Sequence, residues 1–386
     1  MWFFLILLFI NTILLQAALS PADTFFKKKN CDSQCIFNKE LSLESISSFP
    51  TNCSRVCTFL SLNEYSGINE SKLTNLFKNV KVLIGGLSVS NTAFTSLKFL
   101  APLEGIECSD DVGINIQNNN EMVDTGLINL KTIDCPTIFI SAGFQMTGLN
   151  VPKLERITYN LSQNIGITIM APLDTFCITP IETRKFLSTR SPSLIGIVTA
   201  YCKPKNDSKL CNTPAEGCVE IYGNVVIGPT FDMSLMKNVE AIYGCLIING
   251  TSLSNLNAFE KLHYVAHLSN GKPAIRIENN LLLTNATFPM LKRVYSNTID
   301  EIIFKNNSEE LLLDPFLCYG LRNVLSMDNE DAPTFDGETC EQVEKSAPER
   351  NVTYMDGKSK SATMVNNFHE CFDFLVSVVI FVVTQL

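Results

Sequence analysis

Two neighbouring stretches of the chain repeat one spacing of apolar residues, and this spacing decides the fold. Residues 242–265 read IYGCLIINGTSLSNLNAFEKLHYV, and residues 271–294 read GKPAIRIENNLLLTNATFPMLKRV. Four apolar positions recur 29 residues apart, namely Ile248 and Ile277, Phe259 and Phe288, Leu262 and Leu291, and Val265 and Val294. Each stretch is a short alternating strand, a turn and a leg with an apolar residue at every third position. The alternation buries one face of the strand, and the leg returns the chain to the next strand.

This unit, which we call a coil, recurs on both sides of the pair. Ile221-Tyr222-Gly223 returns as Ile242-Tyr243-Gly244 after 21 residues, and a last strand carries Ile302 and Phe304. In the first half of the chain, strands are marked by Leu87 and Val89, Ile114 and Ile116, Ile138 and Ile140, and Ile167 and Ile169. The legs between them are marked by Leu100, Leu103 and Ile106, by Leu127, Leu130 and Ile133, and by Val151, Leu154 and Ile157.

Coils of 21 to 29 residues predict a mainly β fold of two right-handed parallel β-solenoids, similar to leucine-rich repeats, with one strand per coil. A single coil cannot bury its apolar face, whereas stacked coils bury it against one another. Asparagine follows the strand at the same place in four coils, at Asn91, Asn118, Asn279 and Asn306. Because asparagine tolerates the left-handed backbone conformation, we expect these residues at coil corners.

The chain has 14 cysteines, and the repeat predicts how several of them pair. Cys108 and Cys135 occupy the same place in successive coils, 27 residues apart. Adjacent strands lie about 4.7–4.9 Å apart, which suits the Cα separation of a disulfide, so we expect a bridge between coils. Each domain ends on a cysteine after an apolar segment, which predicts two closing bridges, Cys177–Cys202 and Cys318–Cys340.

The remaining cysteines lie near the N-terminus, in the linker and near the C-terminus. Cys31-x3-Cys35 and Cys53-x3-Cys57 resemble two facing helical turns, with Cys31–Cys57 and Cys35–Cys53 favoured and the crossed pairing left open. Cys211–Cys218 would close a short loop in the linker. Cys245 is expected to be a free buried thiol, and Cys371 would leave with a processed C-terminal tail.

The two ends of the chain predict secretion. An apolar run over residues 2–15 is followed by small residues, which is typical of a signal peptide over residues 1–22. Disulfides suit that compartment, as do eight Asn-x-Ser/Thr sequons. These predict glycosylation at Asn52, Asn69, Asn160, Asn206, Asn249, Asn285, Asn306 and Asn351.

The C-terminal end has small residues, a polar spacer and a short apolar tail. This pattern is typical of a GPI-anchor signal, with Ser361 as the candidate attachment residue. A short tail anchor or plain secretion are the alternatives.

Composition narrows the class of function. Charged residues make up 18% of the 386 residues and the net charge is −9, which argues against a nucleic-acid partner. No Gly-x-Ser-x-Gly motif occurs, and the cysteines are assigned to bridges, so we expect neither an enzyme nor a cofactor. His263 and His267 have a spacing that binds metal on a helix, but here they flank inward-facing Val265 in a turn, so no metal site is expected.

The repeats and their closing cysteines resemble the receptor L domains of the insulin and epidermal growth factor receptor ectodomains. The likeness is strongest over residues 218–340, with Ile221-Tyr222-Gly223, Val239-Glu240-Ala241-Ile242-Tyr243-Gly244 and Phe316-Leu317-Cys318-Tyr319. Residues 53–202 repeat the plan less cleanly. Those receptors carry a long cysteine-rich module between their L domains and a kinase domain beyond them, whereas only about 15 residues intervene here and no kinase motif follows.

The resemblance implies an extracellular ligand-binding ectodomain that acts as a soluble binder, decoy or co-receptor for an insulin-like or growth-factor-like peptide. A structural or adhesion protein of the cell surface or matrix is the alternative. We expect a signal peptide (1–22), an N-terminal cysteine-rich cap (23–57), a first receptor L domain (58–202), a linker (203–217), a second receptor L domain (218–340), a polar stalk (341–370) and an apolar tail (371–386).

The outward sheet face of the first domain is the candidate binding surface. Its expected members are Ser88, Asn115, Phe139 and Thr168, with Ser90, Gln117, Ser141 and Met170 one step along. Exposed Phe139 and Met170 would mark an interaction site, and no sequon falls on this face. In the second domain a glycan at Asn249 would obstruct the corresponding face. The alternative is a face that is merely solvated or covered.

Overall fold

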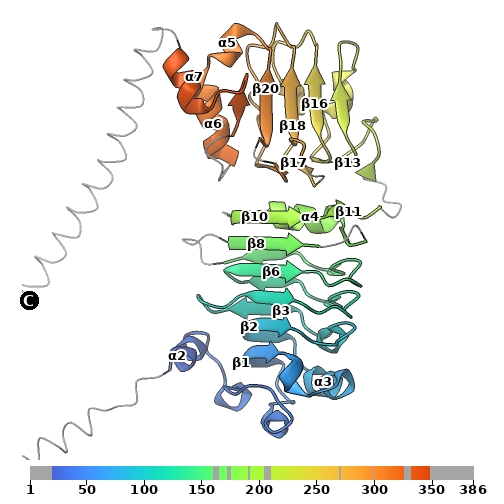
Figure 1. The fold of residues 1–386 in the computed structure, drawn as a ribbon, viewed down its shortest axis with the longest axis vertical. Coiled ribbons are helices and arrows are strands. Elements are labelled where there is room, and N and C mark those ends of the chain that lie inside the picture. The colour runs from blue at the N-terminus through green and yellow to red at the C-terminus, as the bar shows by residue number, and fades with distance from the viewer. Residues whose placement is uncertain are drawn as a thin grey trace, which may run out of the picture.

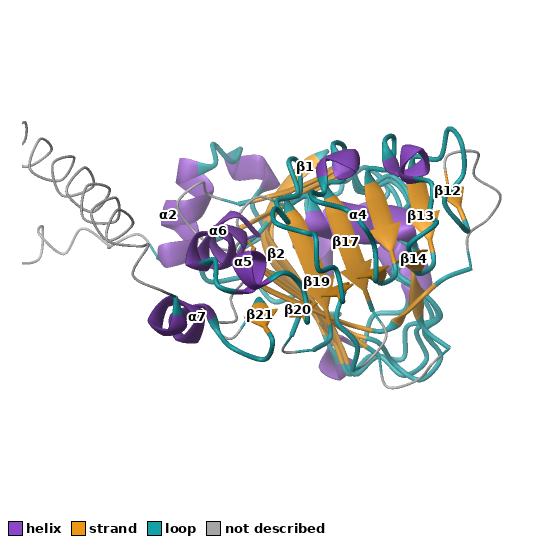
Figure 2. Ribbon diagram, turned by 90° about the horizontal axis from the view of Figure 1, so that it is seen from above, coloured by secondary structure: helices purple, strands orange, loops and turns teal. Residues whose placement is uncertain are grey.

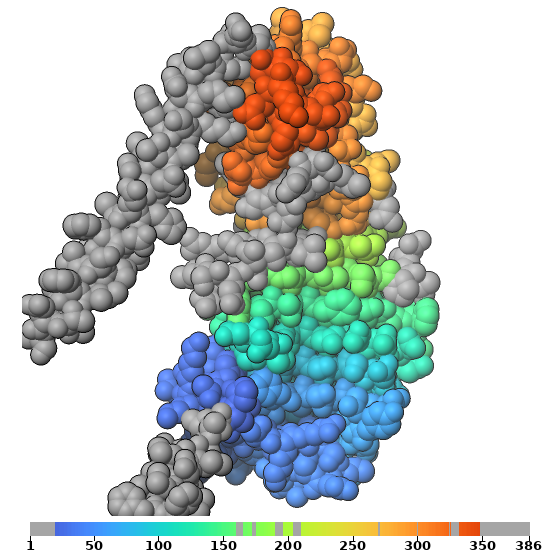
Figure 3. All heavy atoms as spheres, turned by 60° about the vertical axis from the view of Figure 1, so that its left-hand side comes forward, coloured from blue at the N-terminus to red at the C-terminus, as the bar shows by residue number. Residues whose placement is uncertain are grey.

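The structure of the protein is a computed structural model in which the chain forms two stacks of parallel strands (Figure 1). It describes residues 20–159, 165–171, 175–189, 192–203, 210–268, 271–298, 300–325 and 332–347. The signal-peptide residues before Ser20, the sequons Asn160, Asn206 and Asn351, the candidate attachment residue Ser361 and Cys371 lie outside the described residues. The first stack runs from blue to green and the second from yellow to red along the long axis of the molecule (Figure 3).

The first stack is one extended parallel sheet. Its longer branch runs in the order β10 (Pro192–Val198), β8 (Ile165–Met170), β6 (Thr137–Ser141), β4 (Ile114–Gln117) and β2 (Val82–Ser90). Its shorter branch continues from β2 through β3 (Gly105–Cys108), β5 (Thr132–Asp134) and β7 (Arg156–Thr158). β1 (Arg55–Leu62) pairs with β2 over its whole length, and short β9 (Cys177–Ile178) pairs with β11 (Ala200–Tyr201).

Each full coil of the first stack contains two strands, so the expectation of one strand per coil is wrong. The final apolar residue of each leg, expected only to return the chain, lies in a second strand: Ile106 in β3, Ile133 in β5 and Ile157 in β7. The registers pair Ile106 with Ile133 and Ile133 with Ile157. β5 and β7 have only three residues each, with one buried residue in the middle. Such a short alternation does not identify a strand in the sequence, although three residues are enough to form parallel bridges with a neighbour. β2 joins the two branches, because its first half pairs with β3 and its second half with β4.

The second stack consists of two separate parallel sheets. One runs in the order β12 (Leu210–Cys211), β13 (Glu220–Tyr222), β15 (Ala241–Tyr243), β17 (Tyr264–His267) and β19 (Arg293–Ser296). The other runs in the order β14 (Val225–Ile227), β16 (Leu246–Asn249), β18 (Ile275–Glu278), β20 (Ile302–Lys305) and β21 (Thr334–Phe335). The repeated Tyr-Gly pair explains the tight corner between them, because a Cβ on Gly244 would lie 2.3 Å from the carbonyl oxygen of Gly223.

The coil corners follow the asparagine pattern of the sequence. Asn91, Asn118, Asn279 and Asn306 all have positive φ, between 50° and 58°, which confirms the expected left-handed corners. In three of these coils a second asparagine follows and is buried inside the corner, namely Asn119, Asn280 and Asn307. The Asn119 Oδ1 accepts hydrogen bonds from the backbone and hydroxyl of Thr92, and Asn280 does the same for Thr251. Each stack therefore contains a buried asparagine that ties one coil to the preceding one.

Helices and short elements close the ends of the stacks. At the start lie α2 (Pro21–Lys28), η1 (Ser33–Cys35), η2 (Ile46–Ser48), η3 (Glu64–Ser66) and α3 (Glu70–Phe77), and α4 (Pro180–Leu187) lies at the end of the first stack. The turns η4 (Lys98–Leu100), η5 (Met233–Met236) and η6 (Asn257–Phe259) lie in the legs, and α5 (Glu309–Leu312), α6 (Pro315–Leu325) and α7 (Cys340–Ser346) end the second stack. Helices α2, α5, α6 and α7 lie on the same side of the strands in both ribbon views (Figures 1 and 2).

Two features of these ends differ from expectation. The segment of Cys53 and Cys57 is not a helical turn, because Cys57 lies in β1. Helix α7 extends the folded part over residues 341–346, where the polar stalk was expected to begin, and Cys340 and Val343 of this helix are buried. At the other end, Phe26 of α2 is fully buried, and its helix begins at Pro21, just before the predicted cleavage site.

The six disulfides join cysteines in the pairs expected from the sequence, including the favoured pairing of the first four. They are Cys31–Cys57, Cys35–Cys53, Cys108–Cys135, Cys177–Cys202, Cys211–Cys218 and Cys318–Cys340. The Cα atoms of Cys108 and Cys135 lie 4.7 Å apart, which is the spacing of neighbouring strands. Cys245 is free and buried, and burial raises the pKa of its thiol to about 11.

The two stacks pack directly against each other. The last coil of the first stack meets the outward face of the sheet that contains β13, β15, β17 and β19 (Figure 1). The hydroxyl of Tyr295 bonds to the backbone N–H and C=O of Ile197, at 2.6 and 3.1 Å, and the hydroxyl of Tyr201 donates to the carbonyl of Ala266 at 2.8 Å. Buried aromatic groups with paired hydroxyls combine apolar area with directional bonds, so this contact fixes one stack on the other.

An ion pair reinforces this contact. The Arg184 guanidinium in α4 pairs with the carboxylates of Glu220 and Glu240, the latter at 2.9 Å. Tyr243 donates to the Glu220 carboxylate, and burial, followed by that negative charge, raises the pKa of the tyrosine. The outward face of this second-stack sheet is therefore occupied by the first stack.

Candidate ligand-binding face

The strand registers bring the predicted site residues together on one face of the first stack. Ser88 lies beside Asn115, Asn115 beside Phe139, and Phe139 beside Thr168, on β2, β4, β6 and β8. A second row lies two residues further along each strand, where Ser90 pairs with Gln117 and Ser141 with Met170. The side chains between these positions, such as Ile116 and Ile169, point inward and are buried. We call the two rows and their extension on β10 the first-stack face.

Strand β10 extends this face beyond the residues found from the sequence. Gly196 lies beside Thr168, and Val198 lies beside Met170. Val198 is 41% exposed and Met170 39%, and Phe144, just past the end of β6, is 60% exposed. The adjacent strands β8 and β10 thus end in an exposed large apolar side chain, whereas Phe139, expected to be exposed, is half-buried on β6. The short apolar run from Leu194 to Val198, interrupted only by Gly196, was the signal that could have identified β10.

The first-stack face is uncharged. Its outward positions within the described strands are Gly86, Ser88, Ser90, Asn115, Gln117, Thr137, Phe139, Ser141, Gly166, Thr168, Met170, Gly196 and Val198. The core of a protein–protein interface is depleted of charged residues, because their desolvation opposes binding. The small residues leave the backbone accessible, and the exposed apolar side chains provide apolar surface that a bound partner would bury.

The shorter branch of the first stack carries the charges instead. The Lys29 ammonium lies 2.9 Å from the Glu107 carboxylate and 3.5 Å from Asp134, and Lys131 lies 2.7 Å from Glu104. Burial lowers the pKa of Lys29, but the hydrogen bond to Glu107 and the two carboxylate charges outweigh it, so the pKa is raised overall. Helix α2 packs at this side through Phe26, which contacts the start of β2 at Ile84. This branch is therefore partly covered by the chain itself.

One polar group of the first-stack face is unsatisfied. The Asn115 Oδ1 is buried and has no hydrogen-bond partner within the described part of the chain. A buried acceptor without a partner costs about 1–3 kcal/mol, so such groups are rare in folded proteins. The unpaired oxygen lies between Ser88 and Phe139, in the middle of the first row.

The sequons within the described residues lie away from the first-stack face. Asn52 precedes β1 and is exposed, and Asn69 caps the N-terminus of α3. In the second stack, Asn249 is exposed at the end of β16 and accepts a hydrogen bond from Asn279 at 2.8 Å. Asn306 donates to Asn279 from the other side at 2.7 Å. Two predicted glycans therefore flank one edge of the β14–β21 sheet.

That sheet has an outward row of its own, in which three apolar residues lie beside one arginine. The row consists of Val226, Ile247, Arg276 and Ile303, and Val226 is 59% exposed. Arg276 pairs with Glu278 at 2.7 Å. This face thus differs from the first-stack face in having both charges and neighbouring sequons.

The histidine pair does not assemble a site. His267 lies within β17 and His263 immediately before it, so the expectation of a turn is wrong. Four residues of extended strand separate their Cα atoms by about 13 Å. His267 is buried, with its Nδ1 3.2 Å from the carbonyl oxygen of Lys272.

Among the described helices, none combines the length and hydrophobicity required to cross a bilayer.

The family comparison matches the two stacks separately. The family model described as Receptor L domain matches residues 52–147 and residues 217–325, which together make up more than half of the chain. The first match contains β1 to β6, and the second contains β13 to β20 together with α6. A comparison with curated proteins finds no match. The chain belongs to the Receptor L domain family, with two copies of the domain.

Proposed function

We propose that this protein is an extracellular binding protein whose first-stack face takes a peptide or protein ligand. Receptor L domains are non-catalytic domains that bind such ligands. The observation that carries the proposal is the uncharged sheet face on which Met170 and Val198 are exposed side by side on the adjacent strands β8 and β10. An apolar, uncharged patch of this kind loses little free energy to desolvation when a partner covers it.

The ligand class follows from the resemblance to insulin and epidermal growth factor receptor ectodomains. We infer an insulin-like or growth-factor-like peptide, bound by a soluble binder, decoy or co-receptor. The predicted glycans at Asn249 and Asn306 support the first stack as the binding stack, because glycans at that edge would hinder a partner from approaching the second. Cleavage of a signal peptide over residues 1–22 and a GPI anchor at Ser361 would place the protein at the outer cell surface. We also propose that each stack is a right-handed solenoid.

A titration of the secreted protein tests this function. Immobilised protein is exposed to a panel of insulin-like and growth-factor-like peptides, and binding is followed by biolayer interferometry. We expect saturable binding of at least one peptide with a Kd between about 1 nM and 1 μM, a range ordinary for interfaces of standard size. Self-association or retention on extracellular matrix, without saturable binding of any peptide, would contradict the proposal and favour a structural or adhesion role.

A further inference from the structure

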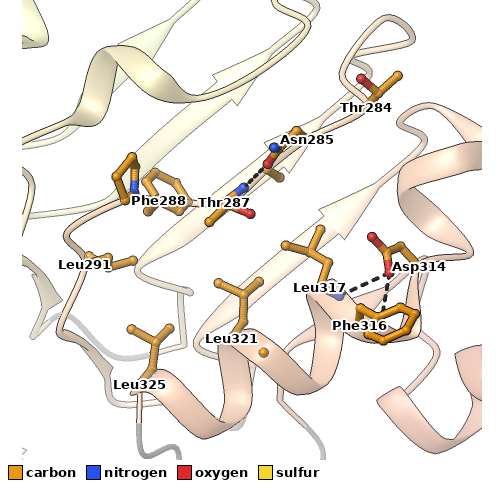
Figure 4. Close-up of a pocket in the computed structure, with 13 residues that line it drawn as sticks. Thr284, Asn285, Thr287, Phe288, Leu291, Asp314, Phe316, Leu317, Leu321 and Leu325 are labelled. Carbon is orange, nitrogen blue, oxygen red and sulfur yellow. Dashed lines mark hydrogen bonds between the residues drawn. The ribbon is translucent and has the colours of Figure 1, made fainter. Parts of the chain in front are cut away.

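A groove lies at the far end of the second stack, away from the first-stack face. It has a volume of about 470 Å³ and runs between the leg that precedes β19 and helix α6 (Figure 4). Thr284, Asn285, Thr287, Phe288 and Leu291 form one wall. Asp314, Phe316, Leu317, Leu321 and Leu325 form the other.

The floor of the groove is apolar and rigid. Phe288, Leu291, Leu321 and Leu325 are buried in the core, and the Cys318–Cys340 disulfide holds α6 to α7. Gly320 leaves space, since no atom lies within 4 Å of where its Cβ would be. Phe316 is 55% exposed at the rim. A secreted protein that leaves such a groove open exposes an apolar surface to solvent, which calls for an occupant.

A sequon lies in the wall of this groove. Asn285-Ala286-Thr287 places an exposed asparagine opposite α6, and the Asn285 Oδ1 accepts a hydrogen bond from the Thr287 N–H at 2.8 Å. This bond orients the carboxamide, and none of the hydrogen bonds between described residues uses its Nδ2. The nitrogen that receives an N-glycan is thus available at the edge of the groove.

We propose that the occupant of the groove is the chain's own N-linked glycan at Asn285, whose first sugars pack between the Asn285 wall and α6. The C–H groups on one face of a pyranose ring pack against aromatic rings, and Phe316 offers such a ring at the rim. The hydroxyl groups of the sugar need acceptors. The Asp314 Oδ1 accepts from the N–H groups of Phe316 and Leu317, at 2.9 and 3.2 Å, and its Oδ2 is left to accept from a sugar.

The glycan would then act as part of the fold. It would cover the apolar rim of α6, and it would keep this end of the second stack from binding a second copy of the chain. The inference requires entry into the secretory pathway but not ligand binding, so the two proposals fail independently.

Glycan removal from the native protein tests the inference. The protein is secreted from a eukaryotic host, and the release of each glycan by an amidase that cleaves N-glycans is followed by mass spectrometry of the site peptides. We expect Asn285 to be occupied and its glycan to be released at least 10-fold more slowly than the glycan at Asn249, which lies at an exposed strand end. Phe316→Ala should raise the release rate at Asn285 at least 5-fold and leave the rate at Asn249 unchanged.

Melting temperatures supply an independent readout. Asn285→Gln and Thr287→Ala both remove the sequon, whereas Thr287→Ser keeps it and is the matched control. We expect Phe316→Ala to lower Tm by several degrees in the glycosylated protein and by at most one degree in the Asn285→Gln background. Where a sequon variant is not secreted, Tm is measured on folded wild-type and Phe316→Ala protein after enzymatic release of the glycan.

Four outcomes would overturn the inference. The first is an Asn285 without a glycan in the secreted protein. The second is release from Asn285 as fast as from Asn249. The third is a Phe316→Ala effect on Tm that is the same with and without the sequon. The fourth is self-association of the glycosylated protein that this substitution abolishes, since the groove would then bind a second copy of the chain and not the glycan.

Discussion

Replacing Asn280 by alanine is expected to lower the free energy of unfolding of the second stack by about 3–5 kcal/mol. Asn280 is fully buried and joins three coils. Its Oδ1 accepts from the N–H and hydroxyl of Thr251, its Nδ2 donates to the carbonyl of Ile248, and it also bonds to Asn307 of the following coil. Alanine would remove these side-chain bonds from Thr251 and Ile248, at a cost of about 1–3 kcal/mol for each buried group left unpaired, which relaxation and entering water offset in part. Asn307 would keep the bond from the backbone N–H of residue 280.

Urea unfolding followed by circular dichroism, with the disulfides intact, measures this effect. Asn238→Ala is the matched control, because Asn238 is exposed and bonds only to Lys261 among its described contacts. The control should change the unfolding free energy by no more than about 0.5 kcal/mol. Equal effects of the two substitutions would show that the buried asparagine does not hold the coils together.

Replacing Phe139 and Met170 together by aspartate is expected to weaken ligand binding at least 100-fold. The two residues lie on neighbouring strands of the uncharged face, Phe139 in the first row on β6 and Met170 in the second row at the end of β8. Two carboxylates there would have to be desolvated on binding, and the apolar contact would be lost, which together amounts to about 3 kcal/mol or more. The Kd is measured by titration with the peptide that binds the wild-type protein.

Val226→Asp is the matched control for this variant. Val226 is 59% exposed on the outward face of the β14–β21 sheet, so it adds a charge to the other candidate face without touching the core. We expect its Kd to stay within a factor of two of the wild type, and the Tm of all variants to confirm that they are folded. A strong loss of affinity in Val226→Asp alone would move the binding site to the second stack.

The repeat of apolar residues predicts much of this fold, because stacking places each residue in contact with the equivalent residue of the next coil. The 29-residue spacing of Ile248 and Ile277 becomes a register pair of β16 and β18. The 27-residue spacing of Cys108 and Cys135 becomes a disulfide between β3 and the residue after β5. The positive φ of Asn118 and Asn279 follows from the recurrence of asparagine at the corner.

The remainder depends on contacts that no local pattern records. The second strand of each coil has a single inward residue, such as Ile133, which by itself does not distinguish a strand from a leg. Asn119 and Asn280 are buried, but each directly follows a corner asparagine, and the sequence alone does not show which of the two asparagines is buried.

The candidate face was predictable only in part, for the same reason. Alternation places Phe139 and Met170 outward on their strands, but Val198 enters the face only because β10 pairs with β8. The contact between the stacks is non-local too, since the hydroxyl of Tyr295 bonds to the backbone of Ile197, 98 residues earlier. The sequence thus predicts which side chains of a single coil point outward. Which of these outward faces are exposed to solvent depends on the elements that pack against the terminal coils.

Site-specific photocrosslinking tests the central claim most directly. A benzophenone amino acid replaces Met170 on the first-stack face in one variant and Val226 on the second-stack face in another, and each is irradiated with a peptide that binds the wild type. The proposed function predicts a covalent adduct from position 170 and none from position 226. An adduct from position 226 with none from position 170 would contradict it.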